Sequence, residues 1–375
     1  MIAIDATPLQ SEHRFRGVGA YTRQLCEQLL TKIPDEVRFL ATKNGLDSLS
    51  PTIQAKSTVG SRGHRPAQLY WVYNELYLRQ MLGKLKPSLF HATDFNGTLR
   101  LPGIPTVATL YDLTNVQPIG SDSSLSTRLS NWRWDVYYHK KLPQVDHLIA
   151  ISQYVKDDAV ATLGIASDHI SVIPLGIDTA QFYPARGTGL FAGRAPYVLY
   201  VGSRDPNKNL ESVLAAFGLV ATEIADVRLA IAGRWNPSDQ GWLQQRIDSD
   251  PSLHGRVDYL GFVSDADMAS LYSNAEVFIF PSLAEGFGFP VLEAMACNTP
   301  VVASNRPPIP QVAGDSALLI DPLDPQAIAT AILSILNSTA RRNDLIQRGQ
   351  TRARLYHWEK VAEDTIAVYR TLGRL

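Results

Sequence analysis

The chain has 375 residues, of which 45% are hydrophobic and 19% charged, as is typical of a globular protein long enough for two domains. Its formal net charge is −1, from 35 basic and 36 acidic residues, which argues against nucleic acid as a partner. The two cysteines have no metal-ligand spacing, and neither a signal peptide nor an apolar run of membrane-spanning length is found, so a cytoplasmic protein is expected.

Short β-branched apolar runs alternate with helical patterns along most of the chain. The predicted strands of the first half are Ile2–Ala6, Val37–Ala41, Ser88–Ala92, Thr106–Leu110 and His147–Ile151. Those of the second half are Tyr197–Val201, Val227–Ile231, Val257–Leu260, Val277–Phe280, Val301–Ser304 and Ala317–Ile320. Helices are predicted between them, for example at Val18–Leu30, Gln68–Leu85, Asn209–Val220, Asp265–Asn274 and Gln326–Leu336. This order predicts an α/β fold with parallel sheets covered by helices on both faces.

Eleven strands are too many for one comfortable sheet, and the least periodic segment, rich in Gly and Pro, is residues 184–196. We therefore predict a linker there, between a first domain at 1–183 and a second domain that begins at 197. Each domain is expected to be doubly wound and Rossmann-like, and the two to face each other across a cleft. Because open α/β sheets bind ligands beyond the carboxyl ends of their strands, this cleft is the expected ligand site.

The stretch R-G-V-G-A-Y-T-R, Arg16 to Arg23, follows the first predicted strand and opens the first long helix. Gly17 and Gly19 can let the backbone approach a phosphate group there. A tight turn before a packed helix explains the same glycines equally well, and both interpretations stay open.

Two further stretches, L-F-H-A-T-D-F-N-G and T-L-Y-D-L-T, each follow a strand of the first domain. They place His91, Asp94, Tyr111 and Asp112 at the expected cleft, where acids and a histidine are candidates for contact with an acceptor hydroxyl. A lone histidine at a strand end is more often structural. The basic stretch 61–65, with Arg79, Lys84 and Lys86, fits either a solvated surface or a phosphorylated or lipid-diphosphate acceptor. Peripheral contact of the first domain with a membrane is a further expectation.

The second domain opens with Y-V-G-S-R-D-P-N-K-N-L, in which Gly202, Arg204 and Lys208 follow a strand. Two cations at the carboxyl edge of a sheet suit a diphosphate and the charge that develops when it leaves. The next predicted strand is followed by a similar glycine and arginine, Gly233 and Arg234, in the stretch I-A-G-R-W-N. Trp235 of this stretch is interpreted as a packing residue. The pair Asp265 and Asp267 is explained by a capping box with Ser264, so no metal site is predicted.

The stretch E-G-F-G-F-P-V-L-E-A-M-A-C runs from Glu285 to Cys297. Pro290 suits a first helical position, so a helix is predicted at Pro290–Ala296, approached by a loop with Gly286 and Gly288. Helix N-termini attract phosphate, and the carboxylates of Glu285 and Glu293 accept hydrogen bonds from hydroxyls. A nucleotide sugar has both kinds of group.

The spacing of Glu285 and Glu293 resembles the E-x7-E pattern of the retaining glycosyltransferases of family 4, also called group 1, which have the GT-B fold. The resemblance covers nearly the whole chain and includes the stretches R-G-V-G-A-Y, T-L-Y-D-L, I-A-I-S-Q-Y-V-K-D-D, V-I-P-L-G-I-D, Y-V-G-S-R-D-P-N-K-N-L and T-P-V-V-A-S-N. It implies that the second domain, residues 197–355, binds the nucleotide sugar and that the first binds the acceptor. It also implies that residues 356–375 form a helix that crosses back to the first domain.

The resemblance assigns roles residue by residue. Glu285 is expected to bind the transferred sugar, Glu293 the ribose, and Lys208 the leaving diphosphate with help from Arg204. The catalytic candidates are then Glu285, Lys208, Arg204, His91, Tyr111 and Asp112. The donor-binding candidates are Gly17, Gly19, Gly202, Gly233, Arg234, Gly286, Phe287, Gly288, Phe289, Val291, Leu292 and Glu293. No cofactor or divalent metal is implied, because the nucleotide diphosphate sugar is itself a substrate.

Two departures from the family pattern bear on catalysis: Tyr111 stands where relatives often have histidine, and Asn207 where they often have arginine. The leading hypothesis is a retaining hexosyltransferase that uses GDP-mannose or UDP-glucose and acts on a glycan, lipid-linked or small-molecule acceptor, in the cytoplasm or at the inner face of a membrane. Its stretches look most similar to those of polysaccharide or O-antigen mannosyltransferases. The alternative is a catalytically weakened nucleotide-sugar-binding subunit of a glycan assembly. An epimerase or phosphorylase on the same fold is a weaker hypothesis.

Overall fold

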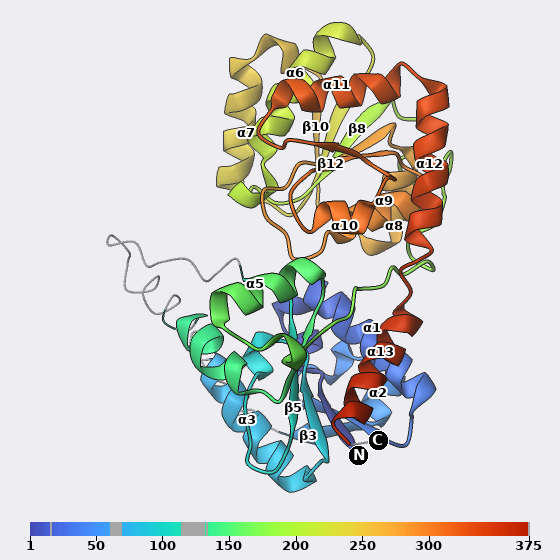
Figure 1. Ribbon diagram of the computed structural model, residues 1–375. Helices are drawn as coiled ribbons and strands as arrows, with labels where there is room; N and C mark the ends of the chain where they lie inside the picture. The colour runs from blue at the N-terminus through green and yellow to red at the C-terminus, as the bar shows by residue number, and fades with distance from the viewer. Residues whose placement is uncertain (16, 61–69, 114–131, 133, 374–375) are drawn as a thin grey trace. The chain divides into compact units, whose positions relative to one another are not determined.

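The computed structural model describes residues 1–15, 17–60, 70–113, 132 and 134–373, and these form two compact units (Figure 1). The first unit comprises Met1–Gly176 and Trp358–Leu375, and the second comprises Ile177–His357. Arg16, the basic stretch at 61–65, the start of the helix predicted at Gln68 and the end of T-L-Y-D-L-T at Thr114 lie outside the described residues.

The first unit is built on a parallel sheet in the order β3-β2-β1-β4-β5-β6-β7. Buried apolar residues dominate its central strands, as expected for a sheet covered on both faces. The strands are β1 (Ile2–Asp5), β2 (Val37–Thr42), β3 (Ser57–Gly60), β4 (Leu89–Ala92), β5 (Thr106–Leu110), β6 (His147–Ala150) and β7 (Ile170–Val172).

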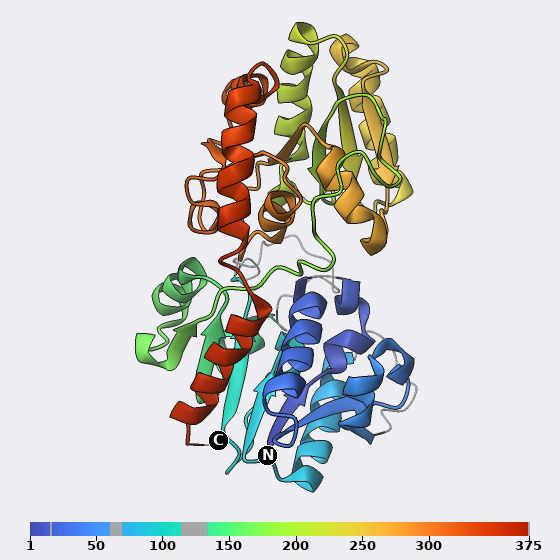
Figure 2. The ribbon, with the colours of Figure 1, turned by 90° about the vertical axis from the view of Figure 1, so that its right-hand side faces the viewer.

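The helices of the first unit include the last helix of the chain, α13 (Trp358–Thr371), which packs on α1 (Gly17–Lys32) (Figure 2). Lys32 on α1 lies 3.0 Å from Glu359 and 2.9 Å from Glu363 on α13. Other helices in the described part of this unit are α2 (Pro51–Ala55), α3 (Tyr70–Leu85) and α5 (Gln153–Leu163), with the 3₁₀ turns η1 (Thr7–Gln10), η2 (Glu12–Phe15) and η5 (Phe95–Gly97) and the π-helix η6 (Val136–Lys141).

The second unit repeats the design with a parallel sheet in the order β10-β9-β8-β11-β12-β13. The strands are β8 (Tyr197–Val201), β9 (Arg228–Ala232), β10 (Val257–Gly261), β11 (Val277–Phe280), β12 (Val301–Ser304) and β13 (Leu318–Ile320). The helices are α6 (Leu210–Glu223), α7 (Pro237–Ser249), α8 (Asp265–Asn274), α9 (Phe289–Ala296), α10 (Ile309–Ala313), α11 (Pro325–Leu336) and α12 (Thr339–Ala353), with turns η9 (Pro206–Lys208) and η10 (Pro251–Leu253). One core cluster joins α6 and α11 to the sheet.

The predicted α/β fold is confirmed, and all eleven predicted strands are present with ends that differ by no more than one residue. Strands β3 and β7 were not predicted. Both are edge strands, the first with the polar sequence S-T-V-G and the second only 3 residues long. Such strands bury little apolar surface and therefore carry a weak hydrophobic pattern.

The segment 184–196, predicted as the linker, lies within the second unit, and the chain instead passes between the units at 176/177 and 357/358. Side chains of α8 hold this segment. Ser273 Oγ accepts a hydrogen bond from Ala185 N at 2.9 Å, and Asn274 Oδ1 accepts one from Gly187 N at 2.8 Å. Local composition gave no sign of these contacts, because their acceptors stand about 88 residues further along the chain.

None of the helices in the described ranges combines the length and the apolar character that a bilayer span requires.

Candidate active site

The candidate site of the second unit lies where the strand order of its sheet reverses, between β8 and β11. Sheets of this kind bind their ligands beyond the carboxyl ends of the strands at that reversal. The chain leaves β8 into the turn η9, which carries Lys208, and leaves β11 into the loop that carries Glu285 and leads into α9. The topology therefore explains why these two residues, 77 positions apart, meet.

Lys208 and Glu285 form an ion pair in which Lys208 Nζ lies 2.6 Å from Glu285 Oε1. The same oxygen accepts a hydrogen bond of 2.5 Å from Ser282 Oγ. The side chain of Glu285 is only 15% exposed, and that of Lys208 is 30% exposed. Lys208 Nζ also lies 5.5 Å from the centre of the Phe280 ring. The pair is therefore partly shielded from water, which strengthens its electrostatic interaction with a charged ligand.

Asn209 connects the two loops that carry this pair. Its backbone has a left-handed conformation with φ of 55°, which asparagine tolerates better than most residues. Its buried side chain donates hydrogen bonds to Pro281 O at 3.1 Å and to Pro322 O at 2.6 Å. A backbone bond of 2.7 Å from Leu283 N to Asn207 O joins the same loops. The positions of Lys208 and Glu285 are thus set by their supporting backbone.

The helix predicted at Pro290–Ala296 is confirmed as α9, which begins one residue earlier at Phe289. Gly288 precedes it with φ of +112°, and a Cβ atom there would lie 2.6 Å from Ile309 Cδ1. The positive φ is what favours glycine at this position, and an added Cβ would in addition displace the end of the Ile309 side chain. Phe287 is buried and packs edge to face on Phe289 at 5.6 Å. Val291 and Leu292 are fully buried, backbone included, so the structure does not place these two predicted donor-binding residues at a surface open to a ligand.

Glu293, on the second turn of α9, is half-buried, and its Oε2 accepts a hydrogen bond of 2.8 Å from Tyr272 OH. Burial raises the pKa of Glu293 to about 7, the bond from Tyr272 opposes this rise, and the nearby charge of Asp265 adds to it. Ionisation of Glu293 therefore costs free energy at this place, and additional hydrogen bonds from hydroxyl donors would stabilise the charged form.

Gly202 and Gly233 hold the ends of β8 and β9 close together. Gly202 O accepts a hydrogen bond of 2.8 Å from Trp235 Nε1, and a Cβ on Gly233 would lie 2.1 Å from that same oxygen. Trp235 is almost fully buried and stacks on Tyr259 at 4.8 Å. Its interpretation as a packing residue is confirmed, and close packing accounts for both glycines.

Arg204 and Arg234 each lie over an aromatic ring. Arg204 Nη1 is 3.1 Å from Asp239 Oδ1 on α7, and its guanidinium lies 4.5 Å from the centre of the Trp242 ring. The guanidinium of Arg234 lies 4.8 Å from the centre of the Phe262 ring. The structure thus brings Lys208 to Glu285, whereas it places Arg204 against α7.

In the first unit, the structure differs from the expectation that His91 meets a ligand. Its side chain is fully buried, with Nδ1 2.7 Å from Tyr369 OH and Nε2 2.9 Å from Thr109 Oγ1. Burial lowers the pKa of His91 to about 3, so the ring is neutral at ordinary pH. His91 therefore joins α13 to the sheet, which is the structural role that a lone histidine most often has.

The other candidates of the first unit either follow β5 or lie at the start of α1. Tyr111 donates a hydrogen bond of 2.7 Å to Thr93 O and packs edge to face on Tyr21 at 5.7 Å. Asp112 is half-buried, and its backbone oxygen accepts a hydrogen bond of 3.2 Å from Tyr138. Gly17 begins α1, and a Cβ on Gly19 would lie 2.5 Å from Arg14 Cα, so close packing against η2 requires that second glycine.

Four residues of these sites were not predicted: Ser282, Asn209, Tyr272 and His13. His13 Nδ1 lies 2.9 Å from Asp94 Oδ2 at the end of β4. Ser282 stands three positions before Glu285 and Asn209 directly follows Lys208, so both lay close to a predicted site residue. Tyr272 and His13 are brought in by tertiary contacts over 21 residues or more.

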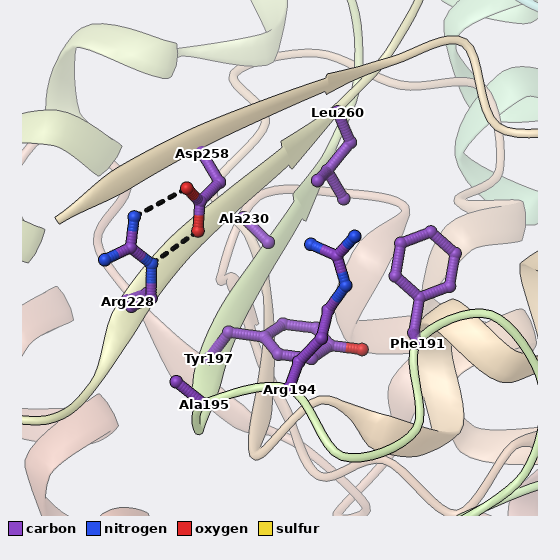
Figure 3. Close-up of a pocket in the computed structure, with 8 residues that line it drawn as sticks. All are labelled: Phe191, Arg194, Ala195, Tyr197, Arg228, Ala230, Asp258 and Leu260. Atoms are coloured by element: carbon purple, nitrogen blue, oxygen red, sulfur yellow. Dashed lines mark hydrogen bonds and ion pairs between the residues drawn. The ribbon is translucent and has the colours of Figure 1, made fainter. Parts of the chain in front are cut away.

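A cavity of about 160 Å³ lies elsewhere in the second unit (Figure 3). It is open on the face of β8, β9 and β10 beside the segment that carries Phe191 and Arg194. On its wall, Arg228 and Asp258 form a two-bond ion pair of 2.5 and 2.6 Å. None of the predicted site residues lines it.

Comparison with known proteins identifies both units. A family model described as Glycosyltransferase Family 4 matches residues 15–181, and one described as Glycosyl transferases group 1 matches residues 185–352. The chain is similar to O-antigen chain mannosyltransferase B of Escherichia coli, with 27% identity over 95% of this chain and 96% of that one. It is also similar to phosphatidyl-myo-inositol mannosyltransferase of Mycolicibacterium smegmatis, with 32% identity over 63% of this chain and 59% of that one.

Solved structures agree on the fold. Sucrose-phosphate synthase from Thermosynechococcus elongatus matches with a TM-score of 0.79 and 24% identity, over 99% of this chain and 98% of that one. HepE of Anabaena, solved with UDP and glucose, matches with a TM-score of 0.71 and 19% identity, over 100% and 99%. With both halves matched by family models and the GT-B fold found along the whole length, the chain belongs to the family 4, or group 1, glycosyltransferases.

Proposed function

We propose that the chain is a retaining, metal-independent hexosyltransferase that moves a hexose from a nucleotide diphosphate sugar to a hydroxyl of a glycan, lipid-linked or small-molecule acceptor. The observation that carries this proposal is the Lys208–Glu285 pair at the strand-order reversal of the second sheet. Glu293 stands eight positions further on, on the helix that begins beside Glu285. A cation and two carboxylates in this order fit a ligand that is both phosphorylated and rich in hydroxyls.

Each group has a chemical task in this proposal. Lys208 neutralises the charge that develops on the leaving diphosphate, Glu285 accepts a hydrogen bond from the transferred hexose, and Glu293 accepts hydrogen bonds from the ribose. The bond between the anomeric carbon and the diphosphate oxygen breaks, and a bond to the acceptor oxygen forms on the same face. The acceptor's proton passes to the leaving phosphate oxygen. No side chain then has to serve as a general base, which agrees with the buried, neutral state of His91.

For the transferred sugar we propose mannose, because several of the relatives in the comparison are described as mannosyltransferases. The complex of HepE with UDP and glucose keeps a UDP-sugar in the set of donors to be tested. The relatives' names also include O-antigen chain synthesis, so a glycan acceptor in polysaccharide biosynthesis is the first class to try. With a lipid-linked acceptor the protein would work in peripheral contact with the inner face of a membrane.

The test is to incubate the protein with GDP-mannose, UDP-glucose and ADP-glucose, each with candidate acceptors, and to measure the nucleotide released. Proton NMR of the product then gives the anomeric configuration. We expect release from one donor and an α-linked product, because the donor is itself α-linked. A β-linked product would contradict retention, and loss of release in the presence of EDTA would contradict metal independence.

A second outcome is defined by the same experiment. Tight binding of one nucleotide, with no release from any donor or acceptor pair, would assign the chain as a nucleotide-sugar-binding subunit. Turnover is the outcome that the proposal expects, because it places the Lys208 cation, paired with Glu285, at the leaving diphosphate, whose additional charge develops only during transfer.

A further inference from the structure

Tyr272 lies near the end of α8, in the stretch L-Y-S-N-A-E, and is fully buried. Its ring packs edge to face on Phe182 at 6.1 Å and on Phe278 at 5.3 Å, and a phenylalanine would make the same two contacts. The hydroxyl is what distinguishes tyrosine here. In the described part of the chain, the only partner of this hydroxyl is Glu293 Oε2, at 2.8 Å. The hydroxyl therefore serves one contact, which it makes with a carboxylate of the candidate site.

The stability of the fold does not account for this contact. Burial raises the pKa of Glu293 to about 7 even though the bond from Tyr272 opposes the rise, so the carboxylate stands where its charge is disfavoured. Removing a hydroxyl and a carboxylate from water costs free energy that two apolar side chains of similar shape would not cost. Ionisable groups with strongly shifted pKa values are common at functional sites. A ligand therefore explains the pair better than stability does.

The bond from Tyr272 makes the two oxygens of Glu293 different. Oε2 accepts the hydrogen bond from the tyrosine, whereas Oε1 accepts none from any residue that the structure describes and is not among the buried oxygens that lack a partner. Oε1 is therefore open to a ligand. A carboxylate oxygen has two lone pairs, so Oε1 alone can accept hydrogen bonds from two neighbouring hydroxyls.

Few other groups influence the charge of Glu293. Asp265, at the start of α8, adds to the rise of its pKa. Burial raises the pKa of the Cys297 thiol, just after α9, to about 12, so this thiol is neutral. Burial also keeps the pKa of Tyr272 well above its ordinary value, so Tyr272 remains a donor throughout the neutral range. Helices α10 and α12 pack on α9 as well, but among their described residues no charged group shifts the pKa of Glu293.

We propose that Tyr272 is a positioning residue of the donor site, which holds Oε2 of Glu293 so that Oε1 faces the two ribose hydroxyls. It thereby sets the affinity for the nucleotide and the preference for ribose over deoxyribose. The proposal rests on the proposed function, in which Glu293 binds the ribose, and it adds a residue that itself touches no part of the donor.

The test compares Tyr272→Phe with the control Tyr197→Phe in the full chain. The control is matched because the hydroxyl of Tyr197 is also buried and donates a hydrogen bond of 2.6 Å to Leu271 O, on the residue next to Tyr272. The probes are GDP and UDP, and their affinities are measured by isothermal titration calorimetry at neutral pH. We expect about a tenfold loss of affinity in Tyr272→Phe, as for the loss of one hydrogen bond to a charged group, and none in Tyr197→Phe.

Two further measurements separate positioning from a purely structural effect. The unchanged protein should bind GDP more tightly than 2′-deoxy-GDP, and this preference should shrink in Tyr272→Phe but not in Tyr197→Phe. In transfer assays, Tyr272→Phe should raise KM for the donor and leave kcat within about twofold of its original value, because contacts to the ribose are equally strong before and during bond cleavage.

The pH dependence of nucleotide affinity provides a third measurement. An ionised carboxylate accepts stronger hydrogen bonds than a neutral one, so affinity should rise with pH and level off above the Glu293 pKa of about 7. Tyr272→Phe removes a donor to the charged form, so affinity should level off at a higher pH in this variant and at the original pH in Tyr197→Phe. Titration of the nucleotide's own phosphates is the same for every variant and cancels when variants are compared at each pH.

Unchanged affinity in Tyr272→Phe, an equal loss in Tyr197→Phe, or a loss that leaves the preference for ribose intact would overturn this inference and leave the proposed function standing. Binding of neither GDP nor UDP by the unchanged protein would overturn both. If Tyr272→Phe unfolds at a much lower temperature than Tyr197→Phe, the comparison is repeated in Glu293→Ala, which has no buried carboxylate left without a donor. In that background Tyr272→Phe should cause no further loss of affinity, and a second loss of similar size would overturn the inference.

Discussion

Glu285 Oε1 accepts hydrogen bonds from both the Lys208 ammonium and the Ser282 hydroxyl. These two bonds fix the position of the carboxylate before a ligand binds. His91 gives the opposite example. It lies within β4, both of its ring nitrogens contact side chains of its own unit, and burial disfavours its charged form. Glu285 instead lies in the loop after β11. The surroundings of each residue therefore decide whether its polar atoms are available to a ligand.

Lys208→Ala should lower kcat by about 10²–10³, as measured for the loss of one donor to a developing oxyanion. The physical reason is that the leaving diphosphate would then develop its charge without a nearby cation. The matched control is Lys360→Ala, because Lys360 pairs with Asp364 at the same distance of 2.6 Å on an exposed helix face. Steady-state release of nucleotide from the donor measures both. Equal rates for the two variants would rule out the role given to Lys208.

Glu293 should make the protein less stable as pH rises. Its pKa of about 7 in the folded chain lies above its ordinary value of 4.5, so between these values the folded state binds more protons than the unfolded state. Stability from this group is therefore fully present below about pH 4.5 and is lost as pH rises through 7.

Glu293→Gln removes this titration, so the variant should gain stability relative to the unchanged protein as pH rises from 4.5 to 8. Urea unfolding at several pH values measures the difference. Glu223→Gln, at the exposed end of α6, serves as the control. A difference between Glu293→Gln and the unchanged protein that stays constant with pH would contradict the account.

At the scale of elements, the loop before α9 is shaped by one backbone conformation. Gly288 with φ of +112° turns the chain into the helix, Pro290 follows in the first turn, and Glu285 is left in front of it. Since this conformation is available mainly to glycine, the geometry of the loop depends on that residue. The same loop is joined to η9 through Asn209 and Asn207, so a change at Gly288 should also disturb the Lys208–Glu285 pair.

Gly288→Ala should destabilise the protein by more than about 1 kcal/mol, because alanine is strained at positive φ and its Cβ would meet Ile309. It should also reduce transfer activity. Gly241→Ala provides the matched control, since Gly241 lies within α7 with no heavy atom near the added Cβ. That variant should instead gain about 0.5–1 kcal/mol. Chemical denaturation measures both, and equal effects of the two substitutions would refute the role of Gly288.

Much of the fold could be predicted from the sequence because parallel strands buried on both faces are continuous apolar runs, as at Tyr197–Val201 and Val277–Phe280. The start of α9 was predicted within one residue, because proline carries its own positional preference. The burial of His91 could not be predicted, since its partner Tyr369 lies 278 residues away. For the same reason nothing in the sequence indicated that side-chain oxygens of Asp94 and Asn96 are buried, or that Asp94 lies 2.9 Å from His13.

At the scale of the whole molecule, the first unit is completed by the end of the chain. Trp358, Val361, Ala362, Ile366 and Tyr369 of α13 are buried there. Glu359 and Glu363 of α13 form ion pairs with Lys32 of α1. The hydroxyl of Tyr369 forms a buried hydrogen bond with His91 of β4. The second unit has its own core between α6, α11 and its sheet, and it receives none of these contacts.

Removal of residues 358–375 should therefore destabilise the first unit and leave the second almost unchanged. Deletion would expose the apolar face of α1 and leave His91 Nδ1 without its partner in a buried place. Hydrogen exchange followed by mass spectrometry measures the protection of each unit separately. We expect faster exchange in β1, β4 and α1 and unchanged exchange in β8, β11 and α6. Equal loss of protection in both units would contradict this division.

The measurement that tests the central claim most directly is Glu285→Ala beside the unchanged protein, with transfer rate and nucleotide affinity determined on the same samples. The account predicts that hexose transfer is abolished while the affinity for free GDP or UDP stays nearly intact, because Glu285 contacts the sugar and Glu293 the ribose. Equal loss of nucleotide affinity, or transfer that continues at the original rate, would contradict the assignment of Glu285 and the Lys208–Glu285 pair as the active centre.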